Sequence, residues 1–238
     1  MMIGLGTIIN TGAIVVGGLL GILLKNIFPE RIQDTLLKAN GVCVLFIGIG
    51  GALQEMLTLE NGELVSDGSM MIILSCVLGS LLGAFLDIEK RIESFGSWLK
   101  KKTKSEKDTG FLDGFVTASL TVCIGAMAVV GAIQDGMQGD FSMLVAKSVL
   151  DFIIVMIMAA AMGKGCIFSA VPVALFQGTI TVLARFIKPL MTEQAISNLS
   201  LIGSILIFCV GVNLVWGKKI KVANMLPAIL FAIAFAFL

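Results

Sequence analysis

The sequence contains no histidine and no tyrosine. Without histidine, the chain cannot form a Cys/His zinc site, a Ser-His-Asp triad or a histidine proton relay. It also has no GxxxxGK[ST] loop for binding a nucleotide. Serine and cysteine nucleophiles therefore lack their usual base, and no paired carboxylates lie at a suitable depth. We do not expect an enzyme.

Charged residues are scarce as well. They make up 14% of the 238 residues, against 57% hydrophobic residues. A soluble globular domain has about 25% charged residues, so this composition excludes a soluble enzyme, a secreted disulfide scaffold and a disordered protein. The net charge of +1 provides no basic field for nucleic acid. The mean hydropathy of +1.01 instead indicates a polytopic membrane protein, which has the lipid bilayer as a partner.

Cysteine is present without a pattern. The five cysteines lie far apart in apolar segments and form no CxxC spacing: Cys43, Cys76, Cys123, Cys166 and Cys209. An odd number cannot pair completely within one chain. We expect buried thiols, with no metal site and no cofactor.

Long hydrophobic segments dominate what remains. A bilayer core of ~30 Å needs about 20 apolar residues per helix. We predict an all-α protein with a single transmembrane domain over residues 1–238 and about eight membrane-spanning helices. Their approximate windows are Leu5–Leu24, Ala39–Leu57, Ser69–Leu86, Gly114–Ile133, Ser142–Met162, Ile167–Ile187, Ile196–Trp216 and Val222–Leu238. The last window is the shortest and contains Pro227, so the count is seven if it does not span.

The basic residues alternate between connections, which predicts the orientation. Most of the 17 lie after the first, third, fifth and seventh windows, as Lys25, Arg31, Lys38, Lys90, Arg91, Lys100, Lys101, Lys102, Lys104, Lys107, Lys164, Lys218, Lys219 and Lys221. The connection after the second window is acidic, with Glu60, Glu63 and Asp67. We therefore predict that both termini are outside and that the basic connections are cytoplasmic.

Residues 88–108 form the only sizeable connection and are predicted to be a cytoplasmic amphipathic linker. Apolar residues recur there at helical spacing, with lysine and glutamate between them: Ile88, Ile92, Phe95 and Leu99, with Trp98 beside them. This pattern is typical of a helix in the lipid headgroup region. Its role is either to set the topology or to respond to anionic lipid.

Two patterns concern helix packing. An offset of 80 residues aligns 51–55 with 131–135, which is typical of a parallel repeat of the second and third predicted helices in the fourth and fifth. Chance similarity between apolar helices is the alternative. The pairs Gly17/Gly21 and Gly79/Gly83 have the small-xxx-small spacing that lets helix backbones approach closely. These faces pack either within one chain or in a homo-oligomer.

One charged pair lies deep in a predicted helix. Asp151 is near the centre of its window, and Lys147 precedes it by one turn on the same face. An ionised group at this depth costs at least ~2.5–3.5 kcal/mol on insertion scales. We interpret the pair as lining a polar cavity at mid-membrane. An ion pair that only neutralises itself is the alternative.

Further amide and acidic side chains lie at comparable depth or toward the outer ends of other windows: Asn10, Gln54, Gln134, Asp135 and Gln177. With Lys147 and Asp151, they predict a polar vestibule that binds a solute or ion. Each alone is also typical of interhelical hydrogen bonding. Pro172, inside the sixth window, predicts that this helix departs from straightness.

Several stretches resemble a known family. They are Gly6–Asn10, Cys123–Met127, Gly131–Gly136, Lys147–Asp151, Phe168–Pro172, Gln177–Gly178 and Asn224–Pro227. They occur in order along nearly the whole chain and are similar to the bacterial inner-membrane family of YqgA-like proteins, the domain of unknown function 554. The resemblance implies a small multi-helix protein of the bacterial cytoplasmic membrane, suspected of transport.

The sequence thus favours a secondary transporter or permease for a small solute or ion. Its energy would come from an ion gradient or from the solute's own gradient. A passive channel and a non-transporting scaffold or assembly protein are the alternatives. The substrate, the coupling ion, the direction and the oligomeric state are left open.

Overall fold

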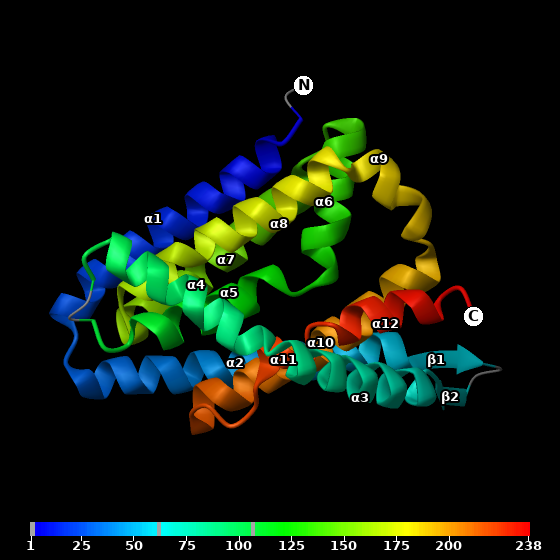
Figure 1. Ribbon diagram of the computed structural model, residues 1–238, viewed down its shortest axis with the longest axis horizontal. Coiled ribbons are helices and arrows are strands. Elements are labelled where there is room, and N and C mark those ends of the chain that lie inside the picture. Colours follow the sequence, from blue (N-terminus) through cyan, green and yellow to red (C-terminus); the bar gives the residue numbers. More distant parts are fainter. Residues whose placement is uncertain (1–2, 61–62, 106–107) are drawn as a thin grey trace. The chain divides into compact units, whose positions relative to one another are not determined.

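The computed structural model describes residues 3–60, 63–105 and 108–238 (Figure 1). Most of this chain is helical. In order, its elements are α1 (Leu5–Ile27), α2 (Glu30–Met56), β1 (Leu57–Glu60), β2 (Glu63–Ser66), α3 (Ser69–Leu86), α4 (Ile88–Lys102), α5 (Phe111–Cys123), α6 (Ala126–Gln138), α7 (Ser142–Met162), η1 (Lys164–Ser169), α8 (Ala170–Val182), α9 (Ala184–Ile187), η2 (Lys188–Leu190), α10 (Glu193–Trp216), α11 (Val222–Met225) and α12 (Ala228–Phe235).

Among the described residues, six helices are long and apolar enough to cross a membrane: Leu5–Lys25, Glu30–Met56, Ser69–Leu86, Ser142–Met162, Lys164–Val182 and Glu193–Trp216. The bent pair α5 and α6 adds a seventh span if it is counted as one. The segment Val222–Phe235 is shorter, roughly 21 Å at 1.5 Å per residue. Each predicted window therefore contains helix, and the expected all-α polytopic membrane fold is confirmed.

The window Gly114–Ile133 was wrongly expected to be one continuous helix. The chain instead bends by 61° between α5 and α6. Gly125 lies at the break with a φ of 146°, a conformation that other residues rarely adopt. At the offset of 80 residues, the aligned residue is Leu45, which lies inside the unbroken α2. The two halves of the predicted repeat thus differ at this point.

The second window also needs a correction at its start. α2 begins at Glu30 rather than near Ala39. Arg31 and Lys38 therefore lie on a helix and not in a loop. Lys38 pairs there with Asp34 one turn away, at 2.7 Å on the exposed side of the helix.

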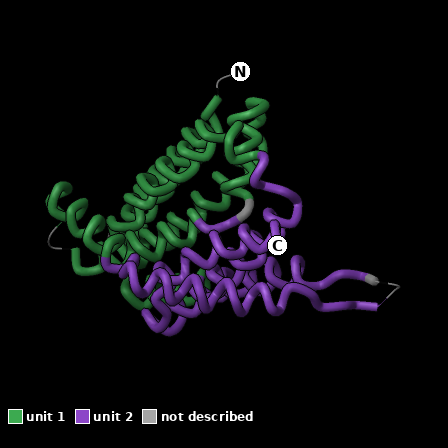
Figure 2. The backbone as a smooth tube through the Cα atoms, turned by 45° about the vertical axis from the view of Figure 1, so that its right-hand side comes forward, with its two compact units in different colours: residues 1–40, 91–123, 127–188 green, residues 41–90, 124–126, 189–238 purple. Residues whose placement is uncertain are grey.

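The chain divides into two compact units (Figure 2). Unit 1 comprises residues 1–40, 91–123 and 127–188, and unit 2 comprises residues 41–90, 124–126 and 189–238. Unit 1 contains α1, α5, α7 and α8, which carry most of the predicted polar residues. Unit 2 contains α3, α10, α11 and α12.

In unit 1, α1 packs closely against α7 (Figure 1). Gly6 lies against Leu144, and Gly17 lies against the backbone carbonyl of Phe152, so the two helices run parallel. Gly21 likewise contacts the carbonyl of Met156. A side chain at Gly17 or Gly21 would push the helices apart. This glycine face is therefore occupied within the chain, and an oligomer would need another surface.

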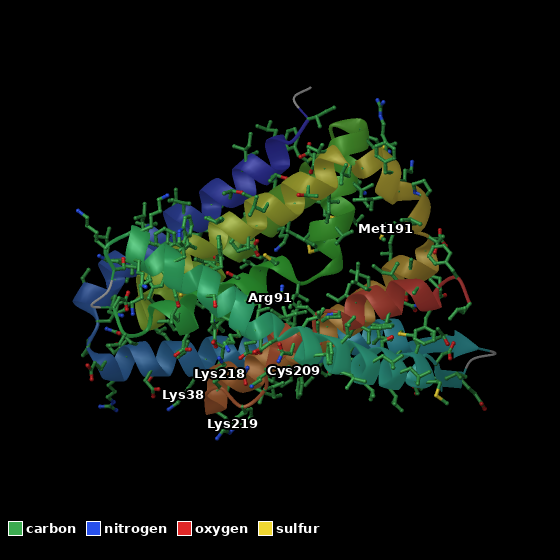
Figure 3. The ribbon with its side chains drawn as sticks, viewed as in Figure 1. Lys38, Arg91, Met191, Cys209, Lys218 and Lys219 are labelled. Carbon is green, nitrogen blue, oxygen red and sulfur yellow. The ribbon has the colours of Figure 1, made fainter. Side chains whose placement is uncertain are left out.

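In unit 2, α3 packs against α11 and α12 through its own glycines. Gly79 lies against Ala228 and Gly83 lies against Asn224, so this second small-residue face is also internal. The Asn224 side chain accepts the backbone N–H of Glu89 at 2.8 Å, and the Glu89 carboxylate pairs with Lys218 at 2.8 Å. Figure 3 shows Lys218 on the loop that follows α10.

The acidic connection after α2 is an antiparallel hairpin, the one exception to the helical fold among the described residues. Its register pairs Leu57 with Ser66 and Glu60 with Glu63. All four residues of β2 are exposed. The sequence between the strands is Asn61-Gly62, a common hairpin-turn dipeptide that lies outside the described residues.

Within the predicted amphipathic linker, residues Ile88–Lys102 form the helix α4. Gly96 lies against Phe115 of α5, and Leu99 is buried. On the exposed side, the Trp98 ring stacks on Phe95 at 5.7 Å, and Lys102 lies 4.9 Å from the centroid of the Trp98 ring. Its position in the headgroup region stays a prediction, and Lys107 lies outside the described residues.

The sixth window is not one continuous α-helix, and its departure from straightness near Pro172 stays a prediction. Residues Lys164–Ser169 form the 3₁₀ helix η1, and the α-helix α8 begins at Ala170. Pro172 therefore lies in the first turn of α8, where a missing N–H group costs least. The α-helix ends at Val182, before the predicted Ile187.

Candidate functional site

A charged pair is buried inside unit 1. Lys147 Nζ lies 2.7 Å from both carboxylate oxygens of Asp151, one turn farther along α7. The side chains of Lys147 and Asp151 are 9% and 4% exposed. Because the two residues share one face of α7, the helix itself brings the charges together. The carboxylate faces the interior of the unit and not lipid.

The amide of Asn10 lies near this pair, and a second amide, Gln177, lies next to Asn10. Asn10 of α1 donates from Nδ2 to Oε1 of Gln177 on α8 at 3.3 Å, and both residues are fully buried. The Asn10 amide also interacts with the Asp151 carboxylate. Three helices, α1, α7 and α8, therefore bring four polar side chains together.

Each of the two amides has one polar atom without a partner. Asn10 Oδ1, an acceptor, and Gln177 Nε2, a donor, are buried and make no hydrogen bond with any residue that the structure describes. Leaving such a group unpaired costs about 1–3 kcal/mol. The site therefore has a free acceptor and a free donor next to a paired cation and anion.

The polar side chains continue along α1 in one direction only. One turn before Asn10, the Thr7 hydroxyl lies 3.5 Å from the Thr181 hydroxyl of α8. Beyond it, the Asp135 carboxylate accepts the backbone N–H groups of Gly4 and Gly6 at 3.1 Å and 3.0 Å. We call this series from Asp135 to Asp151 the polar column.

In the other direction, the column ends at apolar side chains. Ile14 follows Asn10 by one turn of α1, Val155 follows Asp151 on α7, and Val173 precedes Gln177 on α8. All three are fully buried. The charged pair therefore lies at the closed end of the polar column.

The end of α5 lies near the charged pair. Cys123, its last residue, is within electrostatic range of both Lys147 and Asp151. A helix that ends inside a protein leaves its last carbonyl groups without helical partners. In membrane proteins, such ends occur where they border protein or a polar cavity.

The structure brings together some of the predicted site residues and not others. Asn10, Lys147, Asp151 and Gln177 meet, and Asp135 lies at the far end of the polar column as a helix cap. Gln134 is half-buried on α6 and has no hydrogen bond among those that the described residues form. Gln54 is exposed on α2 and belongs to unit 2.

Sequence reasoning missed Thr7. Its position three residues before Asn10, on the same helical face, was the available signal. Within the described ranges, no group of three or more Cys, Asp and Glu side chains is arranged to hold a metal ion. The described side chains of the site supply hydrogen-bonding groups and one ion pair.

Comparisons with known proteins show what the chain is similar to. Residues 5–237 match the family described as "Protein of unknown function (DUF554)". The chain is 31% identical to the uncharacterized protein YqgA of Escherichia coli strain K12, over 96% of this chain and 94% of that protein. It is 29% identical to the uncharacterized membrane protein YdfK of Bacillus subtilis strain 168, over 94% and 92% of the two chains. No solved structure matches.

Proposed function

We propose that this chain, which belongs to the DUF554 family of proteins of unknown function, is a transporter or permease for a small polar solute or ion. It would act in the bacterial cytoplasmic membrane, driven by an ion gradient or by the solute's own gradient. The observation that carries this proposal is the buried Lys147–Asp151 pair next to two amides with unpartnered polar atoms.

The energetics favour a binding role for these residues. Replacing a buried ion pair by apolar residues of similar volume is often neutral or stabilising. The two unpartnered amide atoms add a further cost of about 1–3 kcal/mol each. A helix bundle that only had to be stable would gain from losing all four side chains. A solute that pairs with them would offset these costs while it is bound.

A specific observation also supports a second function, that of a non-transporting scaffold. Both carboxylate oxygens of Asp151 accept from Lys147 at 2.7 Å, so the pair neutralises itself. In this case, the polar column would be dry and would serve only to hold α1, α7 and α8 in register. A passive channel would require water to reach beyond the closed end of the column.

Cysteine accessibility in native membranes separates these functions. In a variant with all five cysteines replaced by alanine, single cysteines are placed at Thr7, Asn10 and Ile14 on α1. We expect a small impermeant thiosulfonate to react at positions 7 and 10 and not at the apolar position 14. Ile8 is the lipid-facing control on the same helix, because it is 62% exposed and lies off the column.

Absence of reaction at both position 7 and position 10 would support the scaffold. Reaction at position 14 as well would support an open channel. For a transporter, proteoliposomes should show saturable uptake of at least one labelled small solute or ion. That uptake should disappear in Asp151→Asn.

A further inference from the structure

The site is electrically neutral although it contains two charges. Lys147 and Asp151 contribute opposite unit charges, and Asn10, Gln177, Thr7 and Thr181 contribute none. One turn beyond the site on α1, α7 and α8, the side chains of Ile14, Val155 and Val173 are apolar and fully buried. A charge that lost its partner here would find no other ionised side chain along the polar column before Asp135, which is already bonded to Gly4 and Gly6.

This neutrality selects among the charges that a ligand can carry. A lone cation that bound Asp151 would separate it from Lys147 and leave the lysine unpaired in a low dielectric. A lone anion bound to Lys147 would leave Asp151 unpaired in the same way. Removing one partner of a buried ion pair is strongly unfavourable. A ligand with one positive and one negative group gives each charge a new partner and leaves neither unpaired.

The unpartnered amide atoms match such a ligand. Asn10 Oδ1 is an acceptor without a partner, and it lies on the residue that interacts with Asp151. An ammonium group paired with Asp151 has three donors, so it can also donate to Asn10. Gln177 Nε2 is a donor, and a carboxylate paired with Lys147 has spare lone pairs to accept from it.

We infer that the solute is a small zwitterion, a molecule that carries one ammonium and one carboxylate group, as an amino acid does. This inference rests on the proposed function and names its substrate class. The ammonium group would lie between Asp151 and Asn10, and the carboxylate group between Lys147 and Gln177. The polar column closes at Ile14, Val155 and Val173. These apolar side chains favour a zwitterion with a small side chain.

Binding to the purified full-length protein in nanodiscs tests the inference with matched compounds. Alanine is the zwitterion, propionate lacks the ammonium group, ethylammonium lacks the carboxylate, and propionamide has no charge. The common amino acids, β-alanine and glycine betaine extend the zwitterion set. We expect at least one zwitterion to raise the melting temperature by roughly 5 °C at saturation, and the three matched compounds to leave it unchanged.

Variants then locate the bound zwitterion. Gln177→Leu removes the free donor and should weaken zwitterion binding about tenfold or more. Gln138→Leu is the matched control, since Gln138 is an exposed amide on α6, and its affinity should equal that of the parent protein. The double variant Lys147→Met/Asp151→Asn should lose zwitterion binding and still fold, because it leaves no unpaired charge.

Binding of propionate or ethylammonium as tight as that of the zwitterions would overturn the inference, as would the absence of any zwitterion binding. Failure of the inference is distinguishable from failure of the proposed function. Uptake of a solute with a single charge, without zwitterion binding, overturns the inference and keeps the transport function. Zwitterion binding without uptake in proteoliposomes supports the inference and contradicts transport.

Discussion

The carboxylate of Asp135 on α6 accepts the backbone N–H of Gly6 on α1 at 3.0 Å, across 129 positions of sequence. Its second oxygen accepts the N–H of Gly4 at 3.1 Å. These amides belong to the first turn of α1, whose N–H groups have no partner within the helix. The positive end of the helix dipole also favours a carboxylate there. Asp135 thus attaches the short helix α6 to the start of α1.

Replacement of Asp135 by alanine should destabilise the protein. It leaves the N–H groups of Gly4 and Gly6 without their acceptor, and we expect a loss of about 1–3 kcal/mol. Asp135→Asn retains one acceptor oxygen and should lose less. Thermal unfolding in detergent measures both, with the exposed Gln138→Ala on the same helix as the control. An unchanged melting temperature for Asp135→Ala would show that the cap is not formed.

Two glycines of α1 should respond in opposite ways to alanine. At Gly17, an added Cβ would lie 2.5 Å from the backbone carbonyl oxygen of Phe152, so Gly17→Ala must separate α1 from α7, at a cost of about 1–3 kcal/mol. At Gly12, a Cβ would meet nothing within 4 Å. Gly12→Ala should therefore be neutral or stabilising by up to about 1 kcal/mol. Equal melting temperatures of the two variants would contradict the close α1–α7 contact.

The sequence predicted the helical membrane fold, because hydrophobic segment length alone decides which parts can span a bilayer. It could not locate the bend after α5. The residues around Gly125 are as apolar as those inside α2, and only the φ of 146° distinguishes them. The β1–β2 hairpin was missed although Asn61-Gly62 between two alternating segments is its usual signature.

For the candidate site, the sequence identified residues and not their contacts. Asp151 and Lys147 could be paired because helical periodicity places them on one face. The contact between Asn10 and Gln177 joins residues 167 positions apart, and no local pattern encodes such a contact. For the same reason, Asp135 was expected to line a vestibule, whereas its neighbours in space make it a helix cap.

The orientation in the membrane is open to a direct test. In unit 1, Asp108 accepts the backbone N–H of Lys164 at 3.1 Å, so the start of α5 and the end of α7 meet. The parallel α1 and α7 agree with the predicted alternation, which places this end in the cytoplasm. In the cysteine-free variant, we expect an impermeant maleimide to label Glu63→Cys in intact cells and Lys102→Cys only after permeabilisation. The reverse result would invert the topology.

The Lys147–Asp151 pair should show strong coupling in a double-mutant cycle. Asp151→Asn leaves a buried ammonium unpaired, and Lys147→Met leaves a buried carboxylate unpaired. Each substitution should therefore lower the free energy of unfolding by about 3–5 kcal/mol. The double variant has no unpaired charge, so its stability should be close to that of the parent protein and the costs of the two single substitutions should not add. Melting temperatures of the four proteins measure this coupling.

α2 offers a matched control for that cycle. Lys38 and Asp34 have the same one-turn spacing and the same 2.7 Å distance, but their side chains are 55% and 59% exposed. Water replaces the lost partner at such a site, so Lys38→Met and Asp34→Asn should leave the melting temperature nearly unchanged and show no coupling. The comparison keeps the one-turn spacing and changes burial, with the order of the two charges along the helix reversed. If the Lys147–Asp151 cycle showed as little coupling as the Lys38–Asp34 cycle, water would already reach the buried pair. The closed end of the polar column would then have to lie beyond Asp151.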